Sequence, residues 1–311
     1  MILGIDTSCY TTSMIVIDDK GNILYENNHM LKVKPGERGL RQSEGFFQHV
    51  NKLSEVFSDL VLKVNPKDLK GIAVSSRPRS VEGSYMPVFQ SGVLFATNLS
   101  NALGIPLYEF SHQEGHLMAA LHSLKVDPIP EKFIGLHLSG GTTELLSVKW
   151  KDEAFTIELI GGTLDLNFGQ LIDRIGVNLG LRFPCGKEMD QMAQSETHSE
   201  YFKVKNVDFG RFNLSGLENQ YNKLIVEKTA AYCCRHIFNT ISNLLFQLIS
   251  DFPLEIPIVF SGGVSSNSIV KEWLKHSCPN KSLYFAPPEY SRDNALGVAE
   301  MGRLQHYVDI C

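Results

Sequence analysis

One segment of this sequence is repeated 131 residues further on, and this repeat constrains the fold more than any other feature. Residues 2–17 (ILGIDTSCYTTSMIVI) and 133–148 (FIGLHLSGGTTELLSV) each contain an apolar run, a few small residues and a second apolar run, and Gly4 aligns with Gly135. Apolar runs of this length predict β-strands, so each copy predicts a β-hairpin with small residues at its tip. Chance similarity between two hairpins is the alternative to internal duplication.

The order of the predicted elements is repeated as well: three strands, a helix, a strand, a helix, a strand and a helix. The first series is expected at residues 2–7, 10–18, 22–30, 46–60, 70–75, 88–103, 106–110 and from 111. The second is expected at residues 132–139, 142–150, 153–160, from about 168, 256–261, 264–277, 281–285 and from 293. A duplicated series in 311 residues, a length that is large for one hydrophobic core, predicts two lobes. We expect residues 1–108 and 294–311 to form the N-terminal lobe and 109–293 the C-terminal lobe.

Two α/β lobes that each open on such a hairpin resemble the actin, hexokinase and heat-shock-chaperone ATPase superfamily, in which both lobes are RNase H-like. In such an architecture the backbone N–H groups of a hairpin tip can face the phosphates of a nucleotide. The sequence contains neither a Walker loop nor the G-x-G-x-x-G fingerprint, so other nucleotide-binding folds are not indicated.

Composition and charge describe an ordinary globular protein. The formal net charge is −5 and 43% of the residues are hydrophobic, so the chain has no global basic signature for nucleic acid, although a local basic groove is compatible with these numbers. Its six cysteines form no C-x-x-C pair, which favours reduced thiols. The N-terminus has no leader pattern and no apolar run reaches membrane length, so we expect a soluble cytoplasmic protein.

Two histidines four residues apart occur in His112-Gln113-Glu114-Gly115-His116. The zinc-protease helix is H-E-x-x-H, but here Gln113 follows the first histidine and Glu114 comes one residue late, so we do not expect a protease. Side chains at i and i+4 share one helical face and can still bind a metal together. An exposed helix face is the alternative for this pair.

A third ligand is available near the C-terminus, where Asp293 precedes a predicted helix in SRDNALGVAEMG. An N-cap is the ordinary role of an aspartate in that position. Its other role is to complete a His112, His116 and Asp293 site with open positions, which would suit zinc or ferrous iron.

Several glycine-containing turns are candidates for binding a nucleotide. Adjacent glycines at the tip of the second hairpin, Ser139-Gly140-Gly141-Thr142, suit a phosphate clamp. In IVFSGGVSSNSIV a strand, two glycines and a helix start favour an anion, and Asn267 can bond a ribose or base edge or cap the helix. Further on, Asp173 suits ribose hydroxyls, with a solvated helix aspartate as the alternative, and Gly186 can press the backbone against a nucleotide. Asp165 is a second carboxylate in the same region.

Taken together, seven blocks resemble one family, the tRNA threonylcarbamoyladenosine transferase subunits, once described as sialoglycoprotein endopeptidases. The blocks occur in the family's order over nearly the whole chain: LGIDTSC, SHQEGH, LSGGTTEL, TLDLNFGQLIDR, LSGLE, SGGVSSN and RDNA. The resemblance implies one divalent metal on His112, His116 and Asp293. It also implies an adenine nucleotide, ATP or threonylcarbamoyl-AMP, at Ser139, Gly140, Gly141, Asp173, Gly186 and Asn267, with tRNA and related complex subunits as partners. Thr142, the next residue of the hairpin tip, is a further candidate for binding the nucleotide.

The chain also departs from the family's pattern. The family's carboxylates after S-C are replaced by Tyr10 and Thr11, and the histidine of its S-G-G-H-T loop by Thr142. Further departures are Arg77, Arg79, Thr97, Leu166, Gln170 and Glu218. Losing charged groups that position a transition state slows a reaction more than it weakens ground-state binding, so we expect slower or altered transfer by a divergent member.

The function that these features predict is transfer of a threonylcarbamoyl group from its adenylate to a tRNA adenine next to the anticodon. Two alternatives keep the binding site. One is a carbamoyl transferase with a small-molecule acceptor, and the other is a nucleotide-binding pseudoenzyme that scaffolds a partner subunit.

Overall fold

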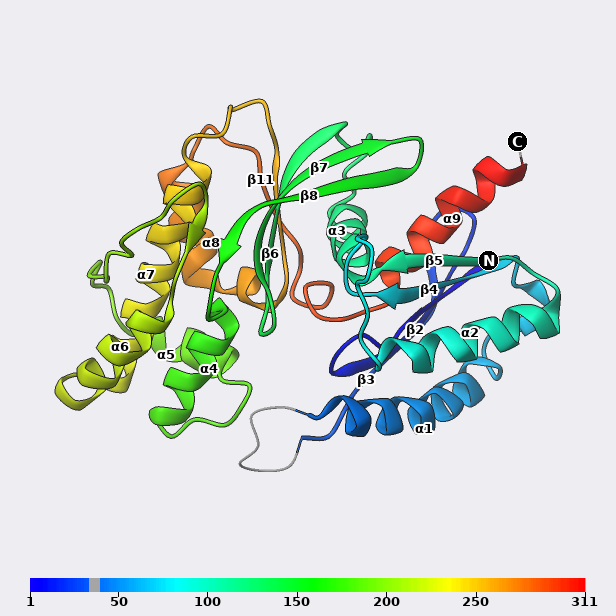
Figure 1. Cartoon of the computed structure of the whole chain (residues 1–311), viewed down its shortest axis with the longest axis horizontal. Helices are drawn as coiled ribbons and strands as arrows, with labels where there is room; N and C mark the ends of the chain where they lie inside the picture. Colours follow the sequence, from blue (N-terminus) through cyan, green and yellow to red (C-terminus); the bar gives the residue numbers. More distant parts are fainter. Residues whose placement is uncertain (34–39, 311) are drawn as a thin grey trace. The chain divides into compact units, whose positions relative to one another are not determined.

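The computed structural model of the chain describes residues 1–33 and 40–310, which form two α/β units (Figure 1). The first unit is made of Met1–Asp127, Lys151–Phe155 and Arg292–Cys311, and the second of Pro128–Trp150 and Thr156–Ser291. Cys311, one of the six predicted thiols, lies outside the described residues. No helix in the described part of the chain has both the length and the apolar character needed to span a membrane.

The first unit contains a five-stranded mixed sheet with the order β3-β2-β1-β4-β5. Its strands are β1 (Ile2–Asp6), β2 (Thr11–Ile17), β3 (Ile23–Met30), β4 (Gly71–Arg77) and β5 (Leu107–Ser111). The first three pair antiparallel as a meander, whereas β4 and β5 run parallel to β1 and to each other. Parallel pairing needs crossover helices, and the sequence between these strands supplies them.

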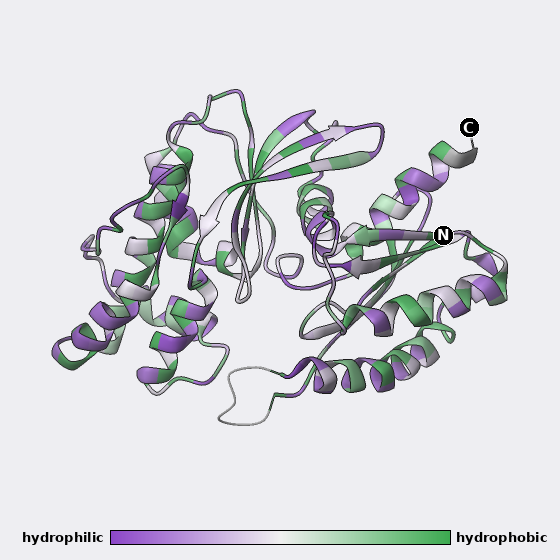
Figure 2. Ribbon diagram, viewed as in Figure 1, coloured by the Kyte–Doolittle hydropathy of each residue, from purple (hydrophilic) through white to green (hydrophobic). Residues whose placement is uncertain are grey.

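Four long helices belong to this sheet: α1 (Gln42–Leu60), α2 (Phe89–Leu103), α3 (His112–Ser123) and α9 (Leu296–Ile310). Successive residues of β1 point to opposite faces. Leu3 and Ile5 therefore join the core under α1 and α2, whereas Gly4 faces α9, where an added Cβ would lie 2.5 Å from the carbonyl oxygen of Ala295. Hydrophobic and hydrophilic residues alternate along α1 and α2, as expected for helices with one buried face (Figure 2).

The second unit repeats this arrangement. Its sheet has the order β11-β10-β6-β7-β8-β9. The strands are β6 (Lys132–Leu138), β7 (Thr143–Lys151), β8 (Ala154–Thr163), β9 (Arg211–Phe212), β10 (Ile258–Ser261) and β11 (Leu283–Phe285). Gly4 pairs with Ile15 in the first hairpin and Gly135 with Leu146 in the second, so the register is kept at the predicted offset of 131. The predicted α/β fold with a duplicated element order is confirmed.

Five helices and a short 3-10 turn complete the second unit. They are α4 (Phe168–Asn178), α5 (Gly186–Ala193), α6 (Ser215–Glu227), α7 (Ala230–Ile249), the turn η2 (Gly263–Ser266) and α8 (Ser268–Ser277). The single helix predicted at 264–277 is divided, because Asn267 adopts an extended conformation and caps α8. Helix α7 lies in the centre of the core, with both Cys233 and Ile237 fully buried.

Helix α3 packs with α9 inside the first unit, which continues to Asp127, beyond the lobe boundary expected at residue 108. Glycines make this close packing possible. A Cβ added to Gly297 of α9 would lie only 1.8 Å from the carbonyl oxygen of Gly115 in α3. The start of α3 and the loop before α9 are thereby held together.

Candidate functional site

The first unit brings His112, His116 and Asp293 together. The two Nε2 atoms of the histidines are 2.9 Å apart. The Asp293 Oδ1 atom lies 3.4 Å from Nε2 of His112 and 3.5 Å from Nε2 of His116. His116 is only 4% exposed, so the alternative of a solvated helix face does not describe this pair.

The start of α3 fixes the direction of both histidines. Ser111 caps the helix by accepting a hydrogen bond from the backbone N–H of Glu114 at 3.2 Å, and the Glu114 carboxylate accepts one from the N–H of Ser111 at 2.7 Å. Ser80 donates a further hydrogen bond to this carboxylate. Glu114 is therefore engaged in capping, which explains physically why it is not placed as the base of a metalloprotease.

Asp293 lies in the loop before α9, because that helix begins at Leu296 rather than at the predicted residue 293. Asp293 does not cap this helix, because the backbone N–H groups at its start donate to other residues. The N–H of Leu296 donates to Oδ1 of Asn294 at 3.0 Å, and the N–H of Ala295 donates to Oγ of Ser13 at 2.9 Å. The Asp293 carboxylate is instead held by the N–H of Tyr10, which donates to Oδ2 at 3.3 Å. Its Oδ1 is directed to the two histidines.

This triangle has the dimensions of a metal site. Two ligand atoms bound at about 2.0–2.1 Å with tetrahedral geometry are about 3.3–3.5 Å apart, close to the three distances given above. Metal-binding histidines usually bond through their second nitrogen to a carboxylate. Here Nδ1 of His112 lies 3.1 Å from Oδ2 of Asp6, and Ser8 and Ser75 donate to the same carboxylate. The donor set therefore fits a divalent ion such as zinc or ferrous iron.

Electrostatics also favour a cation at this position. Burial by itself would lower the pKa of His112, but the Asp6 and Asp293 carboxylates outweigh burial and raise that pKa to about 10. The pKa of His116 is lowered by burial and by the charge of His112. Although burial opposes its ionisation, hydrogen bonds from both histidines hold the pKa of Asp293 well below its usual value. Two buried carboxylates thus require a positive charge between them, which a proton on His112 or a metal ion can supply.

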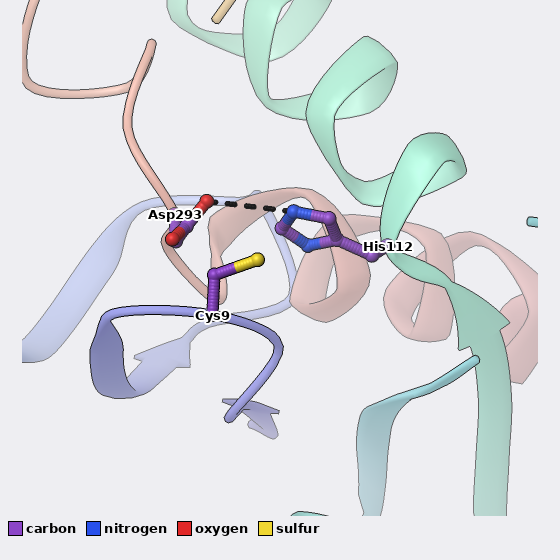
Figure 3. Close-up of side chains that lie close together, drawn as sticks. All are labelled: Cys9, His112 and Asp293. Carbon is purple, nitrogen blue, oxygen red and sulfur yellow. Dashed lines mark ion pairs between the residues drawn. The ribbon is translucent and has the colours of Figure 1, made fainter. Parts of the chain in front are cut away.

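Two residues of this site, Asp6 and Cys9, were not identified from the sequence. Among the described residues, Cys9, His112 and Asp293 form the group in which one ligand atom from each lies within 4.8 Å of the others (Figure 3). Asp6 ends an apolar strand and Cys9 follows in the turn, so their position at the tip of the first hairpin is the signal that could have identified them.

The predicted glycine turns gather in the second unit. The tip at Ser139–Thr142 packs on the start of α4, where an added Cβ on Gly169 would lie 2.6 Å from Ser139 O. Gly262 has φ +86°, and a Cβ added there would lie 2.3 Å from the carbonyl oxygen of Leu138, because β10 lies beside β6. On the other side these loops are open: a Cβ on Gly140, Gly141 or Gly263 would meet no atom within 4 Å. Such open glycine backbone can accommodate phosphate oxygens.

The two polar atoms of the Asn267 side chain suit the two roles considered for it, a helix cap and a ligand contact. Its Oδ1 accepts from the N–H of Val270 at 2.9 Å and caps α8, whereas its Nδ2 is buried without a hydrogen-bond partner. The N-terminus of α8 already holds a carboxylate, since Asp190 accepts from the N–H of Ser268 at 3.0 Å and from its hydroxyl at 2.8 Å. The carboxylate of Asp190 therefore occupies the anion position at the N-terminus of α8. The Nδ2 donor of Asn267 is available to bind a ligand.

Asp173 and Gly186 lie at the junction of α4 and α5. Asp173 accepts from the N–H of Cys185 at 2.7 Å, and burial raises the pKa of its carboxyl group. Neither a ribose contact nor full solvation is needed to explain this carboxylate, because it holds the turn before α5. Gly186 begins α5, and a Cβ there would meet only the side chain of Ile172, at 3.9 Å.

Asp165 is a structural residue. It accepts hydrogen bonds from the N–H groups of Leu214 at 2.8 Å and Ser215 at 3.1 Å, and so caps α6 across the fold. Although burial opposes ionisation, the Ser215 hydroxyl and these backbone N–H groups lower the pKa of Asp165 to about 2. Glu218, one of the departures, lies in the same helix and pairs with Arg174 at 2.7 Å.

Solved structures of similar fold cover nearly the whole chain. Component A of the (R)-2-hydroxyglutaryl-CoA dehydratase of Acidaminococcus fermentans matches with a TM-score of 0.61 and 13% identity, covering 98% of both chains. HypF from T. kodakarensis matches with a TM-score of 0.62 and 12% identity, covering 99% of this chain and 48% of that one. At such identities the likeness concerns the fold alone, and it confirms the predicted α/β fold of two related units.

Sequence comparisons are more specific. Curated relatives named tRNA N6-adenosine threonylcarbamoyltransferase include that of Christiangramia forsetii, 30% identical over 96% of this chain and 91% of the relative. The enzyme of Enterococcus faecalis is 28% identical over 95% of this chain and 87% of its own length. The model of the family TsaD, tRNA N6-adenosine threonylcarbamoyltransferase, matches residues 46–300. The chain therefore belongs to the TsaD family of transferases, as the seven ordered blocks of its sequence predicted.

Proposed function

We propose that this chain transfers a threonylcarbamoyl group from its adenylate to the exocyclic amine of a tRNA adenine next to the anticodon. The observation that carries the proposal is the triangle of His112, His116 and Asp293 in a member of a transferase family. The test is whether the chain restores the modified adenosine to the tRNA of cells that lack their own transferase, measured by mass spectrometry of nucleosides.

In this proposal His112, His116 and Asp293 hold one divalent ion. Such an ion would act as a Lewis acid toward the carbamoyl carbonyl. Asp6 orients the ring of His112 through Nδ1, and the N–H of Tyr10 keeps the Oδ2 atom of Asp293 occupied so that Oδ1 is directed to the ion.

The second unit supplies the nucleotide site of this proposal. The N–H group of Gly140 and the turn at Gly262–Gly263 would bind phosphate oxygens and stabilise negative charge that develops on them. The N–H of Gly141 donates to Oγ of Ser139 at 3.3 Å and holds the shape of this tip. The buried Nδ2 of Asn267 would donate to the nucleoside, which would satisfy an otherwise unpaired group. Gly186 offers a further open approach to the backbone, whereas Asp173 acts by holding the turn beside it.

Nucleotide binding gives a prediction for one side chain. ATP or AMP at millimolar concentration should raise the melting temperature of the protein, because a ligand of the native state stabilises it. Asn267→Ser keeps a capping oxygen for α8 but removes the Nδ2 donor, so it should lose most of the ligand-induced shift while the melting temperature without ligand changes little.

Differential scanning fluorimetry with and without nucleotide measures both quantities. Tyr25→Phe is a suitable control, because it removes a hydroxyl of the first unit that donates to the carbonyl oxygen of Val56 at 3.0 Å; it should lower the unliganded melting temperature without reducing the shift. The absence of any shift with wild-type protein would refute the nucleotide site.

Peptidase activity should be absent. Glu114 is bonded to Ser111 and Ser80 at the start of α3, so no glutamate of this motif is free to activate water beside the histidines. Incubating metal-loaded protein with an unfolded protein substrate should give no cleavage above background by gel electrophoresis. Cleavage that is lost in His112→Ala would contradict this assignment.

The partners of the proposed reaction are tRNA and, as the family resemblance implies, related complex subunits. We assign the reaction to the cytoplasm. The five cysteines in the described part of the chain are free thiols, which agrees with a reducing compartment.

A further inference from the structure

We propose that the Cys9 sulfur is an additional ligand of the metal ion held by His112, His116 and Asp293. This inference rests on the proposed metal site and goes beyond it, because it adds a soft thiolate to a set of imidazole and carboxylate ligands. The substrate would then bind as a fifth ligand, an expansion of coordination that zinc allows.

The first argument is the position of the sulfur. Sγ of Cys9 and one ligand atom each of His112 and Asp293 lie within 4.8 Å of one another. Figure 3 shows the Cys9 side chain directed to the space beside the ion pair of Asp293 and His112. For bonds of about 2.3 Å to sulfur and 2.0–2.1 Å to nitrogen, tetrahedral ligands are about 3.6 Å apart. The sulfur therefore needs to move by little more than about 1 Å, within the range of a side-chain rotation.

The second argument is that the backbone around Cys9 is fixed. Ser8 N–H donates to Oδ1 of Asp6 at 2.9 Å before it, and Tyr10 N–H donates to Asp293 at 3.3 Å after it. The Cys9 carbonyl oxygen lies 3.3 Å from Nε2 of His49, a buried histidine of α1 whose Nδ1 contacts Thr12 at 2.8 Å. The turn that carries the thiol is thus attached to the metal ligand Asp293 and to the outer carboxylate Asp6.

The third argument is chemical. Cys9 is classed as exposed and lies beside the two ligands His112 and Asp293, whereas the other four cysteines of the described residues are buried in the second unit. On binding, the S–H bond breaks, the proton passes to solvent and the sulfur forms a bond to the ion, with no change in oxidation state. A thiolate beside two imidazoles favours zinc over hard ions such as magnesium and manganese.

Cobalt substitution tests this ligand directly. The purified protein loaded with one equivalent of Co²⁺ should show a near-ultraviolet sulfur-to-cobalt charge-transfer band, and X-ray absorption of the zinc form should show one sulfur at about 2.3 Å. Cys9→Ser and Cys9→Ala should both lose the band and bind zinc at least about tenfold more weakly, as the loss of even an outer-shell partner does. Cys278→Ala, a cysteine of the second unit, should keep the band.

The outcomes separate this inference from the proposed function. Bound cobalt without a charge-transfer band, or a band that persists in both Cys9 variants, would overturn the role of Cys9 and leave the His112, His116 and Asp293 site standing. Failure of wild-type protein to bind either cobalt or zinc would overturn both. The wild-type X-ray absorption spectrum decides the question even if a variant does not fold.

Discussion

His116→Ala should reduce the bound metal from about one equivalent to a trace and lower the rate of tRNA modification by about two orders of magnitude or more. Nε2 of His116 lies 2.9 Å from that of His112 and 3.5 Å from Oδ1 of Asp293, so its removal breaks the triangle. Two protein ligands remain from this set, too few for a site that also has to hold substrate. Metal content is measured by mass spectrometry of the purified protein.

A chelator experiment separates loss of metal from loss of fold. Chelation should inactivate the wild-type protein, and added zinc or ferrous iron should restore it, whereas His116→Ala should not respond. The control is His276→Ala, because His276 is an exposed histidine in the last turn of α8. Full metal content and activity in His116→Ala would contradict the assignment of His116 as a metal ligand.

Gly297→Ala should destabilise the first unit by about 3 kcal/mol, at the upper end of the usual cost of overpacking. The added Cβ would lie 1.8 Å from the carbonyl oxygen of Gly115 and 2.8 Å from the backbone nitrogen of Ala119. Backbone atoms cannot rotate away, so α3 and α9 must separate. His112 and His116 lie at the start of α3, and Asp293 precedes α9, so weaker metal binding should accompany the loss of stability.

Urea denaturation followed by circular dichroism measures this change, with Gly216→Ala as the matched control. Gly216 is also helical, but a Cβ there meets no atom within 4 Å. Because alanine is favoured over glycine in helices by up to about 1 kcal/mol, the control should be unchanged or slightly more stable. An equal, small effect of both substitutions would show that the α3–α9 contact is less rigid than described.

The sequence carried most of the information about the fold. The repeated hairpin predicted both sheets and even their common register, because apolar runs and small-residue turns are local signals. Helices α5, α6 and α7 were not distinguished within the region that follows residue 168. Helix α7 is buried over most of its length, and its apolar positions indicate a helix without showing where the preceding helices end, because helix boundaries depend on caps and turns.

Only those residues of the candidate site that have a local sequence signal could be predicted. The spacing of His112 and His116 is a local signal, whereas Asp293 could be either an N-cap or the third ligand, and the family resemblance favoured the ligand. Asp6 and Cys9 were not predicted, because their relation to α3 depends on tertiary packing across more than a hundred residues. Likewise, the carboxylate at the start of α8 belongs to Asp190, which is 78 positions before Ser268. No local sequence pattern indicates such a contact.

The most direct test of the central claim is the nucleoside composition of tRNA in cells whose own threonylcarbamoyl transferase has been removed. Expression of this chain should restore threonylcarbamoyladenosine in a manner that requires His116, with slower accumulation than with a family member that keeps the carboxylates replaced here by Tyr10 and Thr11. Mass spectrometry of digested tRNA gives the amount of the modified nucleoside. Its complete absence despite folded, metal-loaded protein, or its presence at equal levels with His116→Ala, would contradict the account.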